Sequence, residues 1–180
     1  MNKIIALLLV VSMSMALVSC ELETVGTDAT EITDTETAGD QQYSAAPDFT
    51  VYDKNGAPVR LSDFVGKPTV LNFWASWCGP CKSEMPDFNE KYLEVGNEIN
   101  FVMVNLTDGT TETTETAASF IASQGYSFPI YYDTKSNAAN TYGITSIPTT
   151  FFIDRYGYLI AYCVGAIDAE TLQTGIDHIK

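Results

Sequence analysis

Two cysteines separated by two residues, Cys78 and Cys81, are the part of this sequence best suited to chemistry. They follow an apolar run typical of a buried strand and open a segment with helical periodicity. At a helix N-terminus, unpaired backbone N–H groups and the helix dipole favour an anion, so a thiolate forms there at a lowered pKa. The second sulfur lies one helical turn later and can close a disulfide with the first. The pair is therefore a reversible two-electron switch.

The elements on either side of this pair are predicted from their apolar patterns. The preceding strand covers residues 69–74 and is apolar on both faces, as in a central parallel strand. The helix that follows covers about 78–95, and Pro86 should kink it. Apolar residues on this helix step by four and three, which predicts one buried face. That face consists of Cys81, Met85, Phe88, Tyr92 and Val95.

The rest of the domain alternates strands with helices. A β-hairpin is expected at its start, from strands at 49–52 and 59–61 around a turn-rich segment. Further strands are predicted at 99–105, 128–132, 149–154 and 158–164, and further helices at 112–124, 136–142 and 168–179. This order predicts an α/β fold with a central mixed sheet and helices on both faces.

The N-terminal region predicts export and a tether. Residues 1–19 resemble a signal peptide, and because small residues precede Cys20 at the end of the apolar run, they resemble the bacterial lipoprotein signal, in which this cysteine carries lipid. Residues 20–43 are acidic and contain no basic residue, which predicts a disordered linker. Residues 44–180 form the globular domain.

Charge and cysteine count narrow the function. From residue 41 onward, sixteen Asp and Glu stand against eight Lys and Arg, which argues against nucleic-acid binding. Of the four cysteines, Cys20 is assigned to lipid and two form the redox pair, which leaves Cys163 as an unpartnered, buried small hydrophobe. No metal site is expected, because there is no second cysteine pair and the single histidine, His178, lies in the last helix.

The segment Phe73 to Lys82, followed some sixty-five residues later by Ile147-Pro148-Thr149, resembles a thioredoxin-fold oxidoreductase. More narrowly, the chain is similar to the TlpA/ResA-like thiol-disulfide oxidoreductases. The lipoprotein-type leader, the N-terminal hairpin and an extra helix-strand segment at roughly 110–132 support that subgroup. So does the pattern formed by Cys78, Cys81, Glu84 and Pro86.

This resemblance implies roles for particular residues. Cys78 attacks a substrate disulfide, Cys81 resolves the mixed disulfide, and the substrate is bound at the residues Trp77, Gly79, Pro80, Ile147 and Pro148. Pro148 corresponds to the family's cis-proline. Glu84 is the expected proton acceptor, because cytoplasmic thioredoxins carry a buried aspartate where this chain has Asn72, which does not titrate.

The resemblance also implies a direction and partners. Gly79-Pro80 resembles the dipeptide of reducing thioredoxins, so a reductase is favoured over an oxidase. An exported dithiol drifts to the disulfide, which implies an electron donor, a membrane thiol carrier of the CcdA/DsbD kind. The substrates are disulfides of exported proteins, with apocytochrome c as one option, and no cofactor is required.

Two alternatives remain open. A thiol peroxidase shares the fold, but this chain has Leu71 and Ala75 where peroxiredoxins carry proline and threonine. A copper-delivery module of the Sco type shares the fold and the anchor, but it uses cysteines spaced by three residues and a downstream histidine, for which His178 is badly placed. Copper titration of the reduced protein separates delivery from disulfide reduction.

Overall fold

The computed structural model of this protein describes residues 23–24 and 43–180. The predicted signal peptide, the Cys20 anchor and nearly all of the linker lie outside these residues. Residues 23–24 form β1 (Glu23–Thr24), which pairs antiparallel with β9. Within the described ranges, no helix has the length and apolarity needed to cross a membrane.

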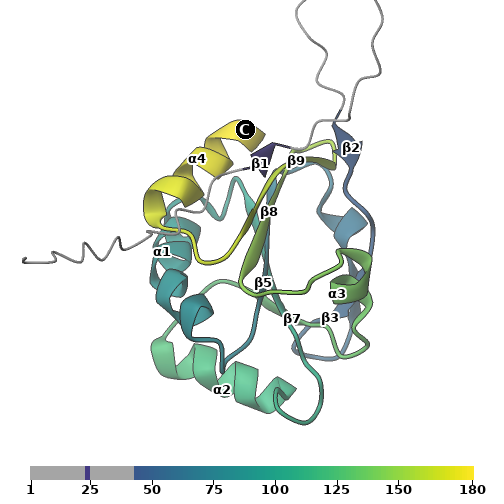
Figure 1. Ribbon diagram of the computed structural model, residues 1–180, viewed down its shortest axis with the longest axis vertical. Coiled ribbons are helices and arrows are strands. Elements are labelled where there is room, and N and C mark those ends of the chain that lie inside the picture. The colour runs from purple at the N-terminus through teal and green to yellow at the C-terminus, as the bar shows by residue number, and fades with distance from the viewer. Residues whose placement is uncertain (1–22, 25–42) are drawn as a thin grey trace, which may run out of the picture.

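A mixed sheet forms the centre of the domain (Figure 1). Its middle strand, β5 (Thr69–Trp74), runs parallel to β6 (Asn100–Asn105) and antiparallel to β8 (Thr149–Ile153). The outer strands are β7 (Ile130–Tyr132), β9 (Tyr158–Val164), β2 (Ser44–Ala45) and the predicted hairpin of β3 (Thr50–Tyr52) and β4 (Pro58–Arg60). The strand order is β1-β9-β8-β5-β6-β7-β3-β4, and β2 also pairs with β9.

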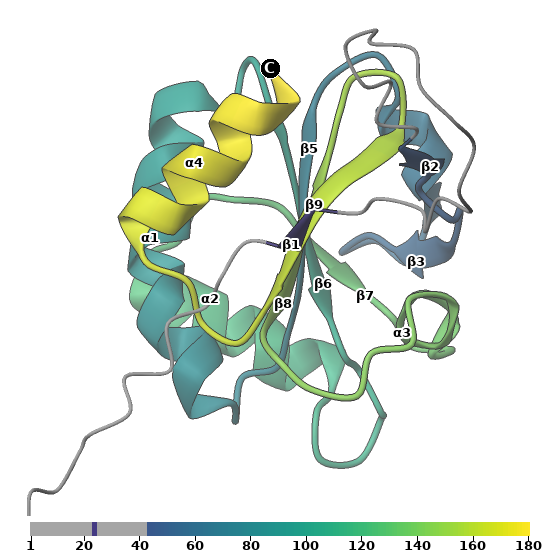
Figure 2. The same ribbon diagram turned by 45° about the horizontal axis from the view of Figure 1, so that its top comes forward.

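Helices cover both faces of this sheet, as predicted (Figure 2). One face carries α1 (Gly79–Val95), α2 (Thr114–Gln124) and α4 (Ala169–Ile179). The other carries α3 (Asn137–Thr141) and the short 3-10 helix η1 (Leu61–Phe64). Each face has its own apolar cluster, so the core is split by the sheet into two layers.

Strand β5 contributes to both layers because successive side chains of a strand point to opposite faces. Val70 and Trp74 pack in the layer below α1, whereas Leu71 and Phe73 pack in the layer below α3. All six residues of β5 are buried. Asn72 shares the face of Val70 and Trp74, so this polar side chain is held inside the protein, on the face covered by α1.

Helix α1 begins where it was predicted and runs without interruption through Pro86. Proline removes a backbone hydrogen bond from a helix interior, but Pro86 and Lys82 both lie at exposed positions, where water can satisfy the free carbonyl. The predicted inner face is confirmed for Cys81, Met85 and Phe88. Glu84 is also buried on this face, a position that apolar periodicity alone does not select.

The predicted start of α2 at Glu112 is wrong by two residues. The helix starts at Thr114, because the side chain of Thr113 caps it by accepting a hydrogen bond from the Thr116 amide at 3.1 Å. Glu112 therefore lies in the preceding loop, and its side chain is fully buried. The cap of α4 is at Asp168, as predicted.

Candidate active site

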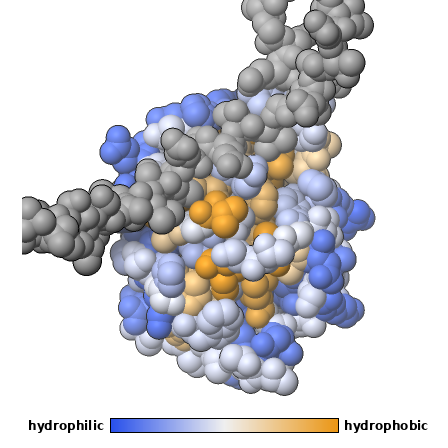
Figure 3. Space-filling view, viewed as in Figure 1, coloured by the Kyte–Doolittle hydropathy of each residue, from blue (hydrophilic) through white to orange (hydrophobic). Residues whose placement is uncertain are grey.

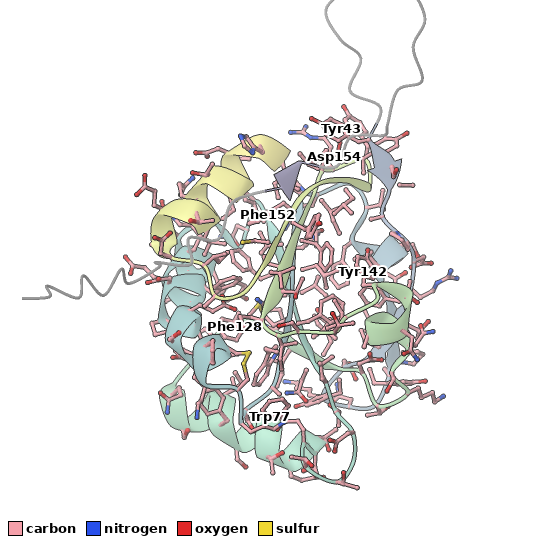
Figure 4. All side chains as sticks on the ribbon, in the orientation of Figure 1. Tyr43, Trp77, Phe128, Tyr142, Phe152 and Asp154 are labelled. Carbon is pink, nitrogen blue, oxygen red and sulfur yellow. A yellow bond between two sulfur atoms is a disulfide. The ribbon has the colours of Figure 1, made fainter. Side chains whose placement is uncertain are left out.

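Cys78 and Cys81 form a disulfide at the start of α1, with their Cα atoms 5.3 Å apart. Cys78 is the N-cap residue of the helix, and its Sγ accepts a hydrogen bond from the Cys81 amide at 3.1 Å. Figure 4 shows this disulfide close to the labelled Trp77. The helix N-terminus thus directs a backbone N–H at the first sulfur, as predicted for an atom that carries negative charge when the pair is reduced.

The loop before β8 lies across from the disulfide. Its Ile147–Pro148 peptide bond is cis, which confirms the expectation drawn from the resemblance. The Ile147 carbonyl oxygen is 3.8 Å from Cys78 Sγ, and the Pro148 carbonyl accepts a hydrogen bond from the Gly165 amide at 2.8 Å. The fold therefore joins residues nearly seventy positions apart in the chain into one site.

The site has an exposed rim and a buried floor. Trp77 is 56% exposed, whereas Cys78 is 4% exposed and Cys81 is fully buried. Trp74 is buried, as predicted for a large aromatic residue in a central strand. Gly79 and Pro80 are exposed as the first two residues of α1. Figure 3 shows hydrophobic side chains gathered on the face over β8 and β9. Because Cys81 is fully buried and Cys78 is not, a partner disulfide would approach Cys78 rather than Cys81.

Glu84 lies three residues after Cys81 on the buried face of α1, and it is only 2% exposed. Asn72 Nδ2 donates to its Oε1 at 2.9 Å, and the Ile167 amide donates to its Oε2 at 3.0 Å. The pKa of Glu84 is raised to about 7, chiefly by burial and to a smaller extent by the charge of Asp87, while the hydrogen bonds from the Ile167 amide and from Asn72 act in the opposite direction. Glu84 can therefore take up or release a proton near neutral pH.

Asn72 connects Glu84 to β8, because its Nδ2 also donates to Thr150 Oγ1 at 2.9 Å. Its Oδ1 is buried and, among the described residues, lacks a hydrogen-bond partner. A half-turn of the amide would bring Oδ1 to the place of Nδ2, where it could accept a hydrogen bond from the O–H of protonated Glu84. The same side chain can thus serve the charged and the neutral form of Glu84.

A second buried carboxylate near the site was missed by sequence reasoning. Glu112 accepts hydrogen bonds from the Ser76 amide at 2.8 Å, from Ser76 Oγ at 2.6 Å and from Asn105 Nδ2 at 2.6 Å. Its local sequence is rich in threonine and acidic residues and gives no sign of burial. The partners come from the loop before α1 and from the end of β6, so only the folded chain reveals this contact.

The prediction for Cys163 needs correction. The residue is buried in β9, as expected, but it is disulfide-bonded, and the described part of the chain contains no free cysteine. Apolar patterning predicts that a cysteine is buried, but it does not predict whether that cysteine forms a disulfide.

In residues 23–24 and 43–180, no group of three His, Cys, Asp or Glu side chains is placed to hold an ion. His178 is exposed in the last turn of α4. The groups of this site that can react or titrate include the two sulfurs and the Glu84 carboxyl group.

Comparison with known proteins gives the same picture. A model of the AhpC/TSA family matches residues 43–162. Thiol-disulfide oxidoreductase ResA from Geobacillus thermodenitrificans is 36% identical over 138 residues, which make up 76% of this chain and 77% of the relative. ResA from Bacillus subtilis is 33% identical over 138 residues, with coverage of 76% and 75%.

Solved structures agree with this assignment. A putative thiol:disulfide interchange protein DsbE from Chlorobium tepidum aligns with a TM-score of 0.66 and 35% identity, covering 74% of this chain and 94% of its own. The exposed lipoprotein thioredoxin of Streptococcus pneumoniae aligns with a TM-score of 0.60 and 34% identity, covering 72% and 98%. With a Cys-x-x-Cys disulfide at the start of α1 of a thioredoxin-like fold, the chain belongs to the AhpC/TSA family and, within it, to the thiol-disulfide oxidoreductases of the ResA type.

Proposed function

We propose that this protein works outside the cytoplasm as a membrane-tethered reductase that reduces disulfides of exported proteins. The observation that carries the proposal is Glu84, a buried carboxyl group with a pKa raised to about 7, three residues after Cys81 on the inner face of α1. A group of this kind accepts the proton of the second thiol, which is the step that releases reduced substrate.

The first half of the reaction uses Cys78. Its thiolate, facing the N–H groups at the start of α1, attacks one sulfur of the substrate disulfide. The substrate S–S bond breaks, one substrate thiolate leaves, and a mixed disulfide joins Cys78 to the substrate. The full burial of Cys81 supports this order, because a bulky substrate meets Cys78 first.

The second half uses Cys81 and Glu84. The Glu84 carboxylate takes the proton of the Cys81 thiol, and the thiolate attacks Cys78 Sγ. The mixed disulfide breaks and the second substrate thiolate leaves, so two electrons have moved to the substrate and Cys78 and Cys81 are joined. A dithiol carrier in the membrane then returns the pair to the reduced form by the reverse exchange.

A turnover assay tests this proposal. Reduction of insulin, with dithiothreitol as electron donor, should be lost in Cys78→Ser. In Cys81→Ser, a mixed disulfide at Cys78 should persist. Full activity of Cys78→Ser would contradict the role of Cys78 as nucleophile. Consumption of hydrogen peroxide at a rate above that of disulfide reduction would instead favour a thiol peroxidase.

The substrate and the donor can be identified with the same variant. Cys81→Ser, expressed as the full chain, should retain its substrate as a mixed disulfide, which mass spectrometry then identifies. An apocytochrome c among the trapped proteins would support a role in cytochrome maturation. Recovery of no specific protein would count against a dedicated substrate.

The tether rests on Cys20, which lies outside the described residues. The related lipoprotein thioredoxin of Streptococcus pneumoniae supports this part of the proposal by its name. Mass spectrometry of the mature protein should find lipid on Cys20, and Cys20→Ala should release the domain from membranes. A mature protein that carries no lipid on Cys20 would contradict the proposal.

A further inference from the structure

We propose that Glu112 is a positioning residue for the reaction: its buried carboxylate holds Ser76 and thereby fixes the turn that presents Cys78. The inference rests on the proposed role of Cys78 as the attacking sulfur. It concerns a residue in the loop before α2 that contacts neither cysteine through its own hydrogen bonds.

The contacts show how the carboxylate holds the turn. Its Oε1 accepts from the Ser76 amide and from Asn105 Nδ2, and its Oε2 accepts from Ser76 Oγ, all between 2.6 and 2.8 Å. Thr107 Oγ1 donates to Asn105 Oδ1 at 2.7 Å, which fixes the orientation of that amide. Both oxygens of Glu112 are thus engaged, and two of the three bonds go to one residue of the turn.

Besides these bonds, the turn is held by the buried Ala75, which packs in the apolar layer below α1. Only three residues, 75–77, connect the end of β5 to the N-cap Cys78, and the Cys78 amide donates to the Ala75 carbonyl at 3.1 Å. The Trp77 side chain is more than half exposed, so its packing restrains the turn less than that of a buried residue. Ser76 is therefore the polar residue through which Glu112 holds the turn.

The burial of Glu112 supports a purpose of this kind. The residue is fully buried, yet none of the three ion pairs among the described residues includes it. A carboxylate without a cation is expensive to bury and is tolerated only when several donors satisfy it. Two of the three donors here belong to Ser76, in the turn that leads to the nucleophile Cys78.

Displacement of this turn would act directly on Cys78. The sulfur receives the Cys81 N–H only while Cys78 stays at the N-cap of α1. A shift of about 1 Å in a reacting group can reduce a rate by roughly 10²-fold. Loss of the N-cap geometry also removes the interactions that favour the thiolate.

Three variants test this inference. Glu112→Ala removes all three bonds. Glu112→Gln keeps the shape, since its amide oxygen can accept from both amide donors and its NH2 can donate to Ser76 Oγ. Asn100→Ala is the matched control, because Asn100 also makes three hydrogen bonds but sits at the other end of β6, about 17 Å from Asn105.

We expect insulin reduction by Glu112→Ala to fall in kcat/KM by roughly 10²-fold, with the pH dependence of Cys78 alkylation shifted to higher pH. Glu112→Gln should stay within about threefold of the wild type in kcat/KM, because the glutamine side chain can still make all three hydrogen bonds and so still holds Ser76. Asn100→Ala should keep the wild-type alkylation profile even if its melting temperature falls.

The inference is overturned if Cys78 of Glu112→Ala is alkylated with the pH dependence of the wild type. It is also overturned if Glu112→Gln loses as much kcat/KM as Glu112→Ala. If Glu112→Ala does not fold, Ser76→Ala takes its place, with a smaller loss in the same direction; an unchanged profile in that variant also overturns the inference. Activity retained by Cys78→Ser would instead refute the proposed function, so the two failures are distinguishable.

Discussion

Two buried carboxyl groups lie near the same disulfide, and they differ in how the protein satisfies them. Glu84, on α1, receives two hydrogen bonds of 2.9 and 3.0 Å, and its burial raises its pKa to about 7. Glu112, on the loop before α2, receives three bonds of 2.6 to 2.8 Å.

This difference separates two tasks. A carboxyl group with few donors in an apolar layer changes its charge near neutral pH and can move a proton. A carboxylate surrounded by short bonds from fixed donors holds those donors in place. Glu84 faces Asn72, whose amide can serve either charge state, whereas each partner of Glu112 donates to it. Proton transfer is thus assigned to Glu84, and positioning to Glu112.

The strongest way to break this distinction is to follow the mixed disulfide in a single turnover. Glu84→Gln should form it at the wild-type rate but resolve it about 10²-fold more slowly at pH 8, because no base takes the Cys81 proton. Glu112→Ala should form it slowly and never accumulate it. Acid quenching and mass spectrometry measure both rates. Accumulation in both variants, or in neither, would show that the two groups act on the same step.

A second effect is the pH dependence of stability. The pKa of Glu84 is about 7 in the folded protein and 4.5 ordinarily, so between these values the folded state holds a proton that the unfolded chain has released. Stability from this group is full below about pH 4.5 and falls by about 3 kcal/mol as the pH rises through about 7. Urea unfolding of the wild type and Glu84→Gln should show this difference between the two curves. Glu90→Gln, an exposed change on the same helix, should run parallel to the wild type.

A third test sharpens the role of Asn72. Asn72→Asp keeps the shape but places a second carboxyl group against Glu84, so like charges raise the higher pKa of the pair. The pH at which reductase activity is half-maximal should move upward by about one unit or more. The alkylation profile of Cys78 should not change, since Glu112 and Ser76 are untouched. A shift in the alkylation profile would mean that Glu84 and Glu112 do not act independently.

The smallest expected effect concerns Thr107. Thr107→Val removes the donor that orients the Asn105 amide but keeps the side-chain shape. Glu112 would keep both bonds to Ser76, so kcat/KM should fall by about two- to threefold and stability by about 1 kcal/mol. Thermal unfolding and insulin reduction measure the two effects. A loss as large as that of Glu112→Ala would place the holding function in Asn105 rather than in Ser76.

Much of the site could be predicted from the chain because its signals are local. The helix start, the first sulfur at its N-cap and the exposed Trp77 follow from residues 69–81, where strand, turn and helix signals stand next to each other. Glu84 was singled out by its spacing from Cys81 and by the absence of an acid at Asn72. Its contact with that same asparagine explains why the acidic group could move from strand to helix.

Glu112 and Cys163 could not be predicted in the same way. Glu112 was predicted to be the first residue of a helix, and nothing within ten residues of it indicates that Ser76 approaches its side chain. Cys163 was assigned a free thiol, yet it is disulfide-bonded. Periodicity carries no information on a contact between segments that are far apart in sequence, nor on whether a buried cysteine forms a disulfide.

The sequence by itself determined the chemistry of this protein: a dithiol at a helix start, on an α/β fold, with an acid one turn further along. These properties depend on propensities and spacings within a few residues. Only the tertiary structure decided the environment of each acid. Burial, donor number and the approach of Ser76 and Asn105 to Glu112 depend on how the sheet brings distant segments together, and the protonation and grip of a buried carboxyl group depend on those surroundings.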